Sequence, residues 1–490
     1  MIRSYFWLPI IAAFFSLSCN NSQPQIPKLV ITLVVDQMRP DLLTRFDDLY
    51  TGGFRWLMDH GIWFTDAHHE HSYTATGPGH FAIGSGQYPG RVGVIGNSFY
   101  DRDLQKKVNC VEDPDAHVVG AEEGKARSYS RYNTTGLGDW VKSSFSNSKV
   151  ISIGGKDRTA VLLGGQKPDL ALYFNYAGRF ISSDYYVESL PDWANQFNTS
   201  LNAEAYKDSL WTKSLPDDVY LKYAREDFYQ GELDDYLNDD YSPVFPIGID
   251  PKNNPKEYFM ARPWFEREIL NLAKEAVVNE NLGVDSSPDL LFIGFSAMDW
   301  MIHDYGPFSQ EIMDAFIKLD KYLGNFIEFL DKSVGLNNVQ FVLTGDHGGL
   351  PLPEYVIEQG GIAGRINREH LKEAFEWIDE EVEEKIDGCK NSLAVITGEE
   401  NLESEILSSL SQNESVFLEI DDAFNLSLLS TARAREISQH QRTYPEPDSA
   451  KHYICFISTG GHDFGHLISG LISNNLHYAS SKADCIGLPS

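Results

Sequence analysis

The chain has 490 residues, of which 42% are hydrophobic and 23% are charged, and its formal net charge at pH 7 is −31. This length allows two or three ordinary domains, or one large α/β domain with insertions. The negative charge argues against nucleic acid or an anionic membrane surface as the main partner, because both require a basic face. An acidic surface that keeps a secreted protein soluble explains most of the excess, whereas an anionic substrate would need local positive charge, such as bound metal ions.

Residues 1–19 have the pattern of an export signal. Arg3 supplies a positive charge, and residues 5–17 form an apolar core that is too short to span a bilayer. The residues before Cys19 resemble a lipoprotein cleavage site, so lipidation at Cys19 and simple cleavage remain equal alternatives. Residues 20–27 are typical of a linker. We expect no transmembrane span, and a location in the periplasm, on the outer membrane through a lipid anchor, or outside the cell.

Three apolar runs that each end in an acidic residue predict the fold class. The runs and their acidic ends are 28–35 with Asp36, 289–298 with Asp299, and 339–345 with Asp346. Nearly continuous runs of β-branched and aliphatic residues are typical of strands that are buried on both faces of a parallel sheet. We therefore predict an α/β fold, with a mostly parallel central sheet sandwiched by helices and with inserted cap segments.

The expected catalytic domain spans residues 28–490 and contains two insertions. The first, at about 171–258, is aromatic, acidic and irregular, and the second, at about 351–444, carries long charged helices. The cysteines after Cys19 are scattered, so they give no metal-binding pattern and cannot be paired from the sequence.

Carboxylates and imidazoles gather at the ends of the three predicted strands. In open α/β sheets, ligands bind just beyond the carboxyl ends of the strands. The residues delivered there are Asp36, Asp299, His303, Asp346 and His347. This mixture of oxygen and nitrogen ligands suits zinc or a similar divalent ion. Each pair alone is a weak signal, but their shared place at three strand ends favours a metal site over a structural role.

Thr76 lies in the segment His71 to His80, just before an apolar stretch that is typical of a helix. The free N–H groups at a helix start favour anions, and a metal-coordinated hydroxyl there would be a competent nucleophile. The alternative is that Thr76 only caps the helix. The spacing does not decide between these two interpretations.

The chain resembles the alkaline phosphatase superfamily in five motifs. They are Val34-Val-Asp36-Gln-Met-Arg, Thr74-Ala-Thr76-Gly-Pro-Gly-His80, Gly93-Val-Ile-Gly-Asn97, Asp299-x-x-x-His303 and Thr344-Gly-Asp346-His347-Gly. The match is closest to the threonine-nucleophile branch, which also holds the nucleotide pyrophosphatase/phosphodiesterases. Within that branch, Gly155-Lys156-Asp-Arg158 and the segment that begins at Phe180 are similar to PafA-type bacterial alkaline phosphatases. The resemblance extends from about Lys28 to Gly349.

The resemblance implies a phosphomonoesterase with two zinc ions. One ion would be held by Asp299, His303 and a C-terminal histidine. The ligands implied for the other ion are Asp36, Asp346, His347 and the oxygen of Thr76. Thr76 would attack phosphorus and form a phosphothreonine, which water would then hydrolyse.

Asn97, Lys156 and Arg158 are expected to hold the non-bridging oxygens of the transferred phosphoryl group, because amide and cationic donors suit them. The cationic pair favours phosphate monoesters over diesters, because a monoester carries an extra negative charge on its phosphoryl oxygens. We expect small monoesters, with broad tolerance for the leaving group. One alternative is a phosphodiesterase or nucleotide pyrophosphatase with the same nucleophile and metals. Solvated surface charges are the alternative interpretation of Lys156 and Arg158. A sulfatase is disfavoured, because that branch matures a Cys or Ser at the place of Thr76.

The C-terminal segment departs from the family pattern. Residues 459–466 offer His462 and His466 as the third ligand beside Asp299 and His303, and we favour His462. The strand expected after them is not recognisable. A catalytically impaired phosphate- or metal-binding protein is therefore an alternative of another class.

Overall fold

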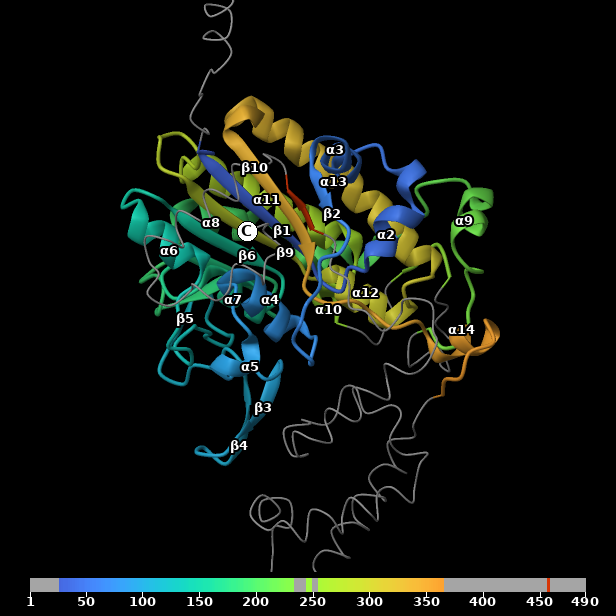
Figure 1. Ribbon diagram of the computed structural model, residues 1–490, viewed down its shortest axis with the longest axis horizontal. Coiled ribbons are helices and arrows are strands. Elements are labelled where there is room, and N and C mark those ends of the chain that lie inside the picture. The colour runs from blue at the N-terminus through green and yellow to red at the C-terminus, as the bar shows by residue number, and fades with distance from the viewer. Residues whose placement is uncertain (1–25, 233–243, 249–253, 365–455, 459–490) are drawn as a thin grey trace, which may run out of the picture.

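The computed structural model describes residues 26–232, 244–248, 254–364 and 456–458, and the following account concerns those residues (Figure 1). The strands are β1 (Leu29–Val35), β2 (Ile62–Phe64), β3 (Ser98–Asp101), β4 (Lys106–Asn109), β5 (Val118–Val119), β6 (Val150–Gly154), β7 (Leu170–Phe174), β8 (Phe180–Ser183), β9 (Asp289–Phe295), β10 (Val339–Gly345) and β11 (Phe456–Ser458). The α-helices are α2 (Pro40–Arg45), α3 (Gly53–His60), α4 (Thr76–Ser85), α5 (Pro89–Val92), α6 (Leu137–Ser144), α7 (Asp157–Gly164), α8 (Asp192–Ser200), α9 (Asp217–Tyr223), α10 (Pro255–Met260), α11 (Pro263–Asn279), α12 (Ala297–Tyr305), α13 (Gln310–Ser333) and α14 (Pro353–Glu358).

A mixed sheet forms the centre of the molecule, in the strand order β2-β11-β10-β1-β9-β6-β7-β8-β5. The strands from β10 to β7 are parallel to one another. In the register of β1, Val35 lies opposite Gly345 of β10 and Phe295 of β9. The strands of the three predicted runs therefore end level with one another at the same edge of the sheet, which confirms the α/β prediction. The second run, 289–298, is a strand only to Phe295 and then enters α12, so Asp299 follows its strand end by one helical turn rather than directly. The acidic residues are still brought together.

The strands at both margins of the sheet are antiparallel, so "mostly parallel" describes its centre. β8 pairs antiparallel with β7 and β5, and β11 pairs antiparallel with β10 and β2. The short link between β7 and β8 explains one of these pairs. It turns at Gly178, whose φ is +86° and whose N–H donates to Asn175 O over 2.9 Å. A parallel connection needs a crossover of a dozen or more residues, so this link permits only a hairpin.

Helices cover both faces of the sheet, and the alternation of β1 shows why (Figure 1). Leu33 and Val35 pack into a large apolar cluster that includes residues of α3, α11 and α13. Val30 and Val34 point the other way, into a cluster with residues of α6 and α7. Because successive side chains of a strand point to opposite faces, a continuous apolar run is what a strand between two helical layers requires.

The boundaries of the two expected insertions stay predictions. The structure places residues 171–174, the start of the first, within β7 of the central sheet. Residues 180–183 continue the sheet as β8, and α8 and α9 follow. Of the second insertion, the structure describes residues 351–364, which include α14, and the rest lies outside the described residues.

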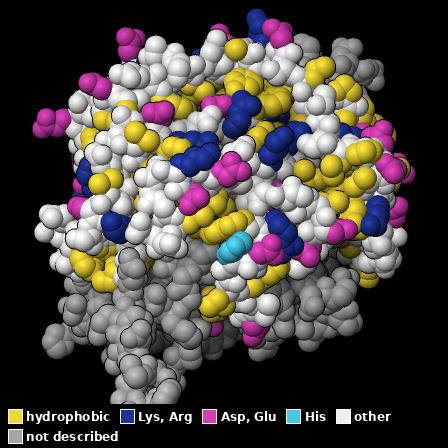
Figure 2. Space-filling view, turned by 90° about the horizontal axis from the view of Figure 1, so that it is seen from above, with side chains coloured by type: hydrophobic (Ala, Val, Ile, Leu, Met, Phe, Trp, Pro, Cys, Tyr) yellow, Lys and Arg dark blue, Asp and Glu magenta, His cyan; other side chains and the backbone are white. Residues whose placement is uncertain are grey.

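The surface mixes charges of both signs. On the face shown in Figure 2, Lys and Arg side chains lie among Asp, Glu and apolar side chains. Among the helices that the structure describes, none combines the length and the apolar character needed to cross a membrane. The predicted export signal and Cys19 lie outside the described residues.

Candidate metal centre

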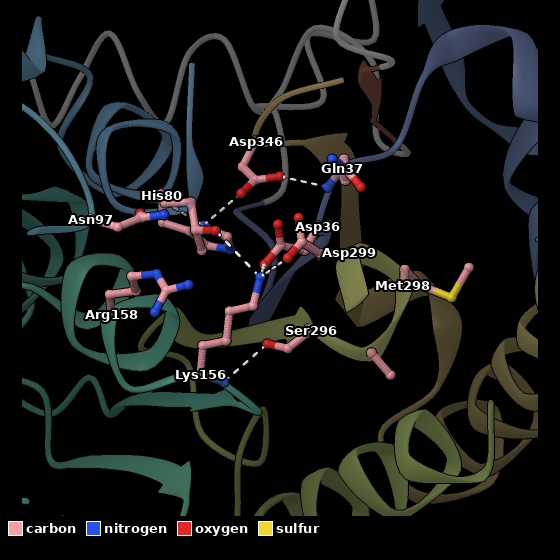
Figure 3. Close-up of polar contacts among 12 residues, drawn as sticks. Asp36, Gln37, His80, Asn97, Lys156, Arg158, Ser296, Met298, Asp299 and Asp346 are labelled. Carbon is pink, nitrogen blue, oxygen red and sulfur yellow. Dashed lines mark hydrogen bonds and ion pairs between the residues drawn. The ribbon is translucent and has the colours of Figure 1, made fainter. Parts of the chain in front are cut away.

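Three strands deliver three buried carboxylates to one place. Asp36 follows β1 directly, Asp346 follows β10, and Asp299 lies in the first turn of α12, the helix after β9. Asp36 and Asp346 are 0% exposed and Asp299 is 5% exposed. Burying ionised carboxylates without compensation costs a large free energy, so this cluster needs cations (Figure 3).

Asp346 is oriented by the backbone and by one histidine. Its Oδ1 accepts hydrogen bonds from the N–H groups of Gln37, over 3.0 Å, and His347, over 2.9 Å. Its Oδ2 lies 3.0 Å from Nδ1 of His80. Burial raises the pKa of Asp346, but the charges of His347 and His80 and the hydrogen bond with His80 lower it, and the net pKa lies below the ordinary value.

His347 faces the same group of carboxylates. Its Nε2 lies 3.3 Å from Asp36 Oδ1 and 3.6 Å from Asp346 Oδ2. Burial lowers its pKa, but the negative charges of Asp346 and Asp36 raise it more, to about 10. A histidine that ligates a metal must be neutral, so a metal ion bound here would take the place of this proton.

The donor set fits a divalent metal ion. Asp36, Asp346 and His347 each offer one ligand atom, and these atoms all lie within 4.8 Å of one another. Three buried carboxylate oxygens each lie beside a histidine nitrogen: Asp346 Oδ2 beside His80 at 3.0 Å, Asp36 Oδ1 beside His347 at 3.3 Å, and Asp299 Oδ1 beside His303 at 3.3 Å. Buried carboxylate oxygens beside an imidazole nitrogen are the ligands that zinc and similar ions take in proteins.

Asp299 and His303 form a second half of the site on α12. They are four residues apart, on one face of the helix, and His303 Nε2 lies 3.3 Å from Asp299 Oδ1. Burial and the charge of Asp36 raise the pKa of Asp299, but Lys156 and His303 lower it to a net value of about 2. The side chain of His303 is 55% exposed, unlike any ligand candidate in the first half.

Lys156 lies between the two halves. Its Nζ is 2.7 Å from Asp36 Oδ2, pairs with Asp299 Oδ2, and is 3.3 Å from Thr76 Oγ1 (Figure 3). Burial lowers its pKa, but the two carboxylates, Asp299 first, raise it more, so it stays charged. Its backbone N–H donates to Ser296 Oγ over 3.0 Å, which fixes the start of α7 beside the start of α12.

Thr76 is the first residue of α4 and is 2% exposed. Ala75 is the N-cap of this helix, and no side chain caps it. The Thr76 hydroxyl instead points toward Lys156. Asn97 lies at the same helix start, where its Oδ1 accepts a hydrogen bond from Gly77 N over 2.7 Å. Thr76 therefore lies at the helix start without capping it, and its role as a nucleophile stays a prediction.

Arg158 approaches from the first turn of α7, two residues after Lys156 (Figure 3). Its Nη1 lies 3.6 Å from Asp157 Oδ1, and its Nε is buried without a hydrogen bond among the described residues. Burial lowers its pKa, but the negative charge of Asp157, with smaller contributions from Asp36 and Asp299, raises it above the ordinary value. The position of Arg158 beside Asp157 at the start of α7 leaves its expected role, holding a phosphoryl oxygen, as a prediction.

His462 and His466 lie outside the described residues, so the expected third partner of Asp299 and His303 stays a prediction. Two residues of the site had no predicted role. His80 bonds Thr76 O over 2.8 Å and lies 3.0 Å from Asp346 Oδ2. The sequence feature that could have indicated His80 is its position four residues after Thr76, which puts both side chains on the same face of the helix. Gln37 gave no signal beyond its place after Asp36.

Comparisons with known proteins agree with this geometry. Residues 30–384 match the family described as type I phosphodiesterase/nucleotide pyrophosphatase. Alkaline phosphatase PafA of Elizabethkingia meningoseptica is 32% identical over 346 residues, which cover 69% of this chain and 63% of PafA. Alkaline phosphatase PhoV of Synechococcus elongatus is 33% identical over 347 residues, which cover 67% of this chain and 60% of PhoV.

The chain thus spans about three fifths of the length of these curated relatives: 63% of PafA and 60% of PhoV. The fold matches the crystal structure of a PafA mutant with a TM-score of 0.76 and 24% identity, over 89% of this chain and 91% of that one. The wild-type PafA structure matches with a TM-score of 0.68. The residues matched by the family model, 30–384, include all three strand ends described above. The chain therefore belongs to the type I phosphodiesterase/nucleotide pyrophosphatase family, with PafA-like alkaline phosphatases among its relatives.

Proposed function

We propose that this protein hydrolyses phosphate monoesters with two zinc ions, through a phosphothreonine formed at Thr76. The observation that carries the proposal is the charged Nζ of Lys156, which lies 3.3 Å from Thr76 Oγ1 and is surrounded by buried carboxylates. The hydroxyl proposed as nucleophile, the side chains proposed as metal ligands and a cation thus lie close together. The names of the relatives PafA and PhoV support the same reaction class.

The proposed ligands divide into two sets. The first set is Asp36, Asp346, His347 and the oxygen of Thr76. The second set is Asp299 and His303 together with His462. When bound, paired zinc ions lower the pKa of an attacking hydroxyl and stabilise the attacking and leaving oxygens of an in-line displacement.

The protein's own groups would position the phosphoryl group on Thr76. The hydroxyl of Thr76 would attack phosphorus at the start of α4, where the helix dipole and free N–H groups favour negative charge. Asn97, fixed by its hydrogen bond to Gly77 N, would bind one non-bridging oxygen through its amide. Lys156 and Arg158 would bind the others through charge-assisted hydrogen bonds.

The preference for monoesters rests on these two cations. A monoester has a more negative phosphoryl group than a diester, so two positive side chains beside the nucleophile stabilise it more. The family also includes phosphodiesterases and nucleotide pyrophosphatases, as its description states, and this makes a diesterase the second candidate. The substrates we propose are small monoesters with varied leaving groups. We place the reaction outside the cytoplasm, with Cys19 as a possible lipid anchor.

The test compares an aryl phosphate monoester with an aryl phosphate diester, using full-length zinc-loaded protein and Thr76→Ala as the control. Faster monoester hydrolysis that Thr76→Ala abolishes is the expected result. Faster diester hydrolysis would move the assignment to the second candidate. Trapping of acid-stable phosphothreonine by mass spectrometry after incubation with the monoester tests the intermediate directly.

A further inference from the structure

We propose that the carboxamide oxygen of Gln37 is a ligand of the metal ion held by Asp299 and His303. The proposal rests on the metal centre proposed above and adds a donor to its second half. Gln37 lies directly after Asp36 and is 5% exposed. In Figure 3 its side chain lies beside Asp299 and Asp346.

The backbone of Gln37 is held in a conformation that needs a reason. Its φ is +65°, in the left-handed region, which costs free energy for a residue with a Cβ atom. In this conformation its N–H donates to Asp346 Oδ1 over 3.0 Å. A glycine at this position would adopt the same φ without strain. The presence of a long polar side chain there points to a use for the side chain itself.

Packing directs that side chain toward α12. A Cβ atom built on Gly349 would lie 3.0 Å from Gln37 Cδ and 2.9 Å from Ile302 Cγ2. The carbonyl oxygen of Gly349 in turn accepts a hydrogen bond from Arg39 Nη1 over 3.1 Å. The glycine therefore leaves room for the Gln37 side chain to lie between this loop and the helix that carries His303.

The distances from His303 to the end groups of Gln37 and Asp299 fit a tetrahedral metal ion. Gln37 Nε2 lies 3.4 Å from His303 Nε2, and the same His303 nitrogen lies 3.3 Å from Asp299 Oδ1. Ligand atoms about 2.1 Å from a tetrahedral ion are about 3.4 Å apart. The nitrogen and oxygen of a carboxamide exchange places by a half turn of the last bond, and their assignment follows from the neighbours.

The carboxamide oxygen has no competing partner among the described residues. Gln37 Oε1 is buried and makes no hydrogen bond there. A buried carbonyl oxygen without a partner is costly, and a cation between Asp299 and His303 would remove that cost when the amide turns its oxygen toward it. The second half of the site would then have three donors within the described residues.

The chemistry of an amide oxygen predicts two unequal metal sites. A neutral carbonyl oxygen binds zinc less strongly than a carboxylate, and it suits harder ions such as Mn²⁺. Besides its histidine, the site of Asp36, Asp346 and His347 has two carboxylates, whereas the site proposed for Asp299, His303 and His462 would have one carboxylate and one amide besides its histidines. We therefore expect the second site to bind zinc more weakly.

The test is a metal titration of the full chain, read by absorption of Co²⁺ and by zinc competition with a chelator. Gln37→Met keeps the size of the side chain but removes the oxygen. Gln37→Asn keeps a carboxamide and tolerates the left-handed backbone, but it is one methylene too short. Both should weaken the weaker site about 10- to 100-fold and leave the tighter site unchanged. Gln37→Glu, which supplies a carboxylate oxygen at full reach, should bind at least as tightly as the wild type.

Each outcome decides the matter. Unchanged affinity and Co²⁺ spectrum in Gln37→Met would overturn the proposal, as would equal weakening in Gln37→Met and Gln37→Glu, which would indicate a hydrogen bond rather than a ligand. If the wild type binds no metal, the metal centre itself is wrong and this inference falls with it. If the wild type binds two ions and Gln37→Met also does so with the same affinity, only the inference on Gln37 is wrong. Melting of the metal-free variants identifies any that fail to fold.

Discussion

The two halves of the metal centre are built in different ways. Asp36 and Asp346 follow neighbouring strands whose ends are level, and backbone N–H groups hold one oxygen of Asp346. Asp299 and His303 instead project from α12, and the His303 side chain is half exposed. The sheet therefore fixes the first half, whereas the second half depends on how one helix is seated. We expect the first half to be the tighter and less adaptable metal site.

Asp346→Asn should break the first half and have the largest effect. The substitution keeps the shape but removes one negative charge from the buried group around His347. We expect loss of one tightly bound zinc ion and a fall in kcat/KM of about 10³-fold or more, since the nucleophile loses its electrostatic support. Metal analysis and steady-state kinetics measure both effects. Asp331→Asn, an exposed change on α13, is the matched control. Full zinc binding in Asp346→Asn would contradict the assignment.

Lys156→Met should have the next largest effect. It should lower the free energy of unfolding more in the metal-free protein than in the zinc-loaded protein. In the metal-free protein, Lys156 pairs with Asp36 and Asp299, and removal of one partner of a buried ion pair costs about 3–5 kcal/mol. Bound metal ions would compensate the same carboxylates, so the loss should be smaller after loading. Denaturant unfolding with and without zinc measures the difference. Equal losses in both states would show that the metal ions do not lie beside these carboxylates.

The same variant sharpens the choice of substrate. Monoester hydrolysis should fall about 10²-fold or more in Lys156→Met, because a charged donor beside Thr76 is lost. Diester hydrolysis should fall much less. A similar fall for both substrates would contradict the proposed basis of monoester preference.

The sequence predicted the first half more completely than the second. Asp36 and Asp346 could be placed because continuous apolar runs predict parallel strands, and parallel strands end at one edge. His303 could be paired with Asp299 through helical spacing. The role of Gln37 could not be predicted, because it depends on a left-handed φ and on the space beside Gly349, neither of which leaves a periodic signal.

The start of β7 was difficult to predict for a related reason. Residues 171–174 lie next to a long aromatic and acidic stretch, and the change of composition suggested an insertion. The structure shows that Tyr173 and Phe174 continue the sheet and pair with Ile181 and Phe180 of β8. Buried aromatic residues occur both in strands and in inserted cap segments, so composition alone did not show to which of them residues 171–174 belong.

Zinc affinity at the first half of the metal centre, which contains His347, should depend on pH. The pKa of His347 is raised to about 10 from an ordinary 6.5, so the metal-free fold gains stability from its proton below pH 6.5 and loses that gain as the pH rises toward 10. Zinc must displace this proton. We expect affinity at the first site to rise up to about tenfold per pH unit between pH 7 and 9. Chelator competition at three pH values measures the slope, and a flat profile would contradict a protonated His347.

Glu266→Gln should have the smallest effect on activity. It tests the hydrogen bonds that hold the start of α12 in place. Glu266 lies in α11 and is 0% exposed, and its Oε1 accepts hydrogen bonds from Ala297 N over 2.6 Å and Met298 N over 3.2 Å. These donors are the start of the helix that carries Asp299. A glutamine oxygen can accept the same bonds, so activity at pH 7 should change less than about twofold.

The stability of Glu266→Gln should nevertheless depend on pH in a defined direction. Burial raises the pKa of Glu266 from 4.5 to about 8, despite the two backbone hydrogen bonds, which lower it. A raised folded-state pKa gives the wild type a stabilising contribution below pH 4.5 that is lost as the pH rises through 8. Glutamine does not titrate. The melting temperature of the variant relative to the wild type should therefore rise between pH 5 and pH 9. If the difference stays constant across that range, Glu266 is ionised in the folded protein, and its carboxylate rather than its neutral acid holds the start of α12.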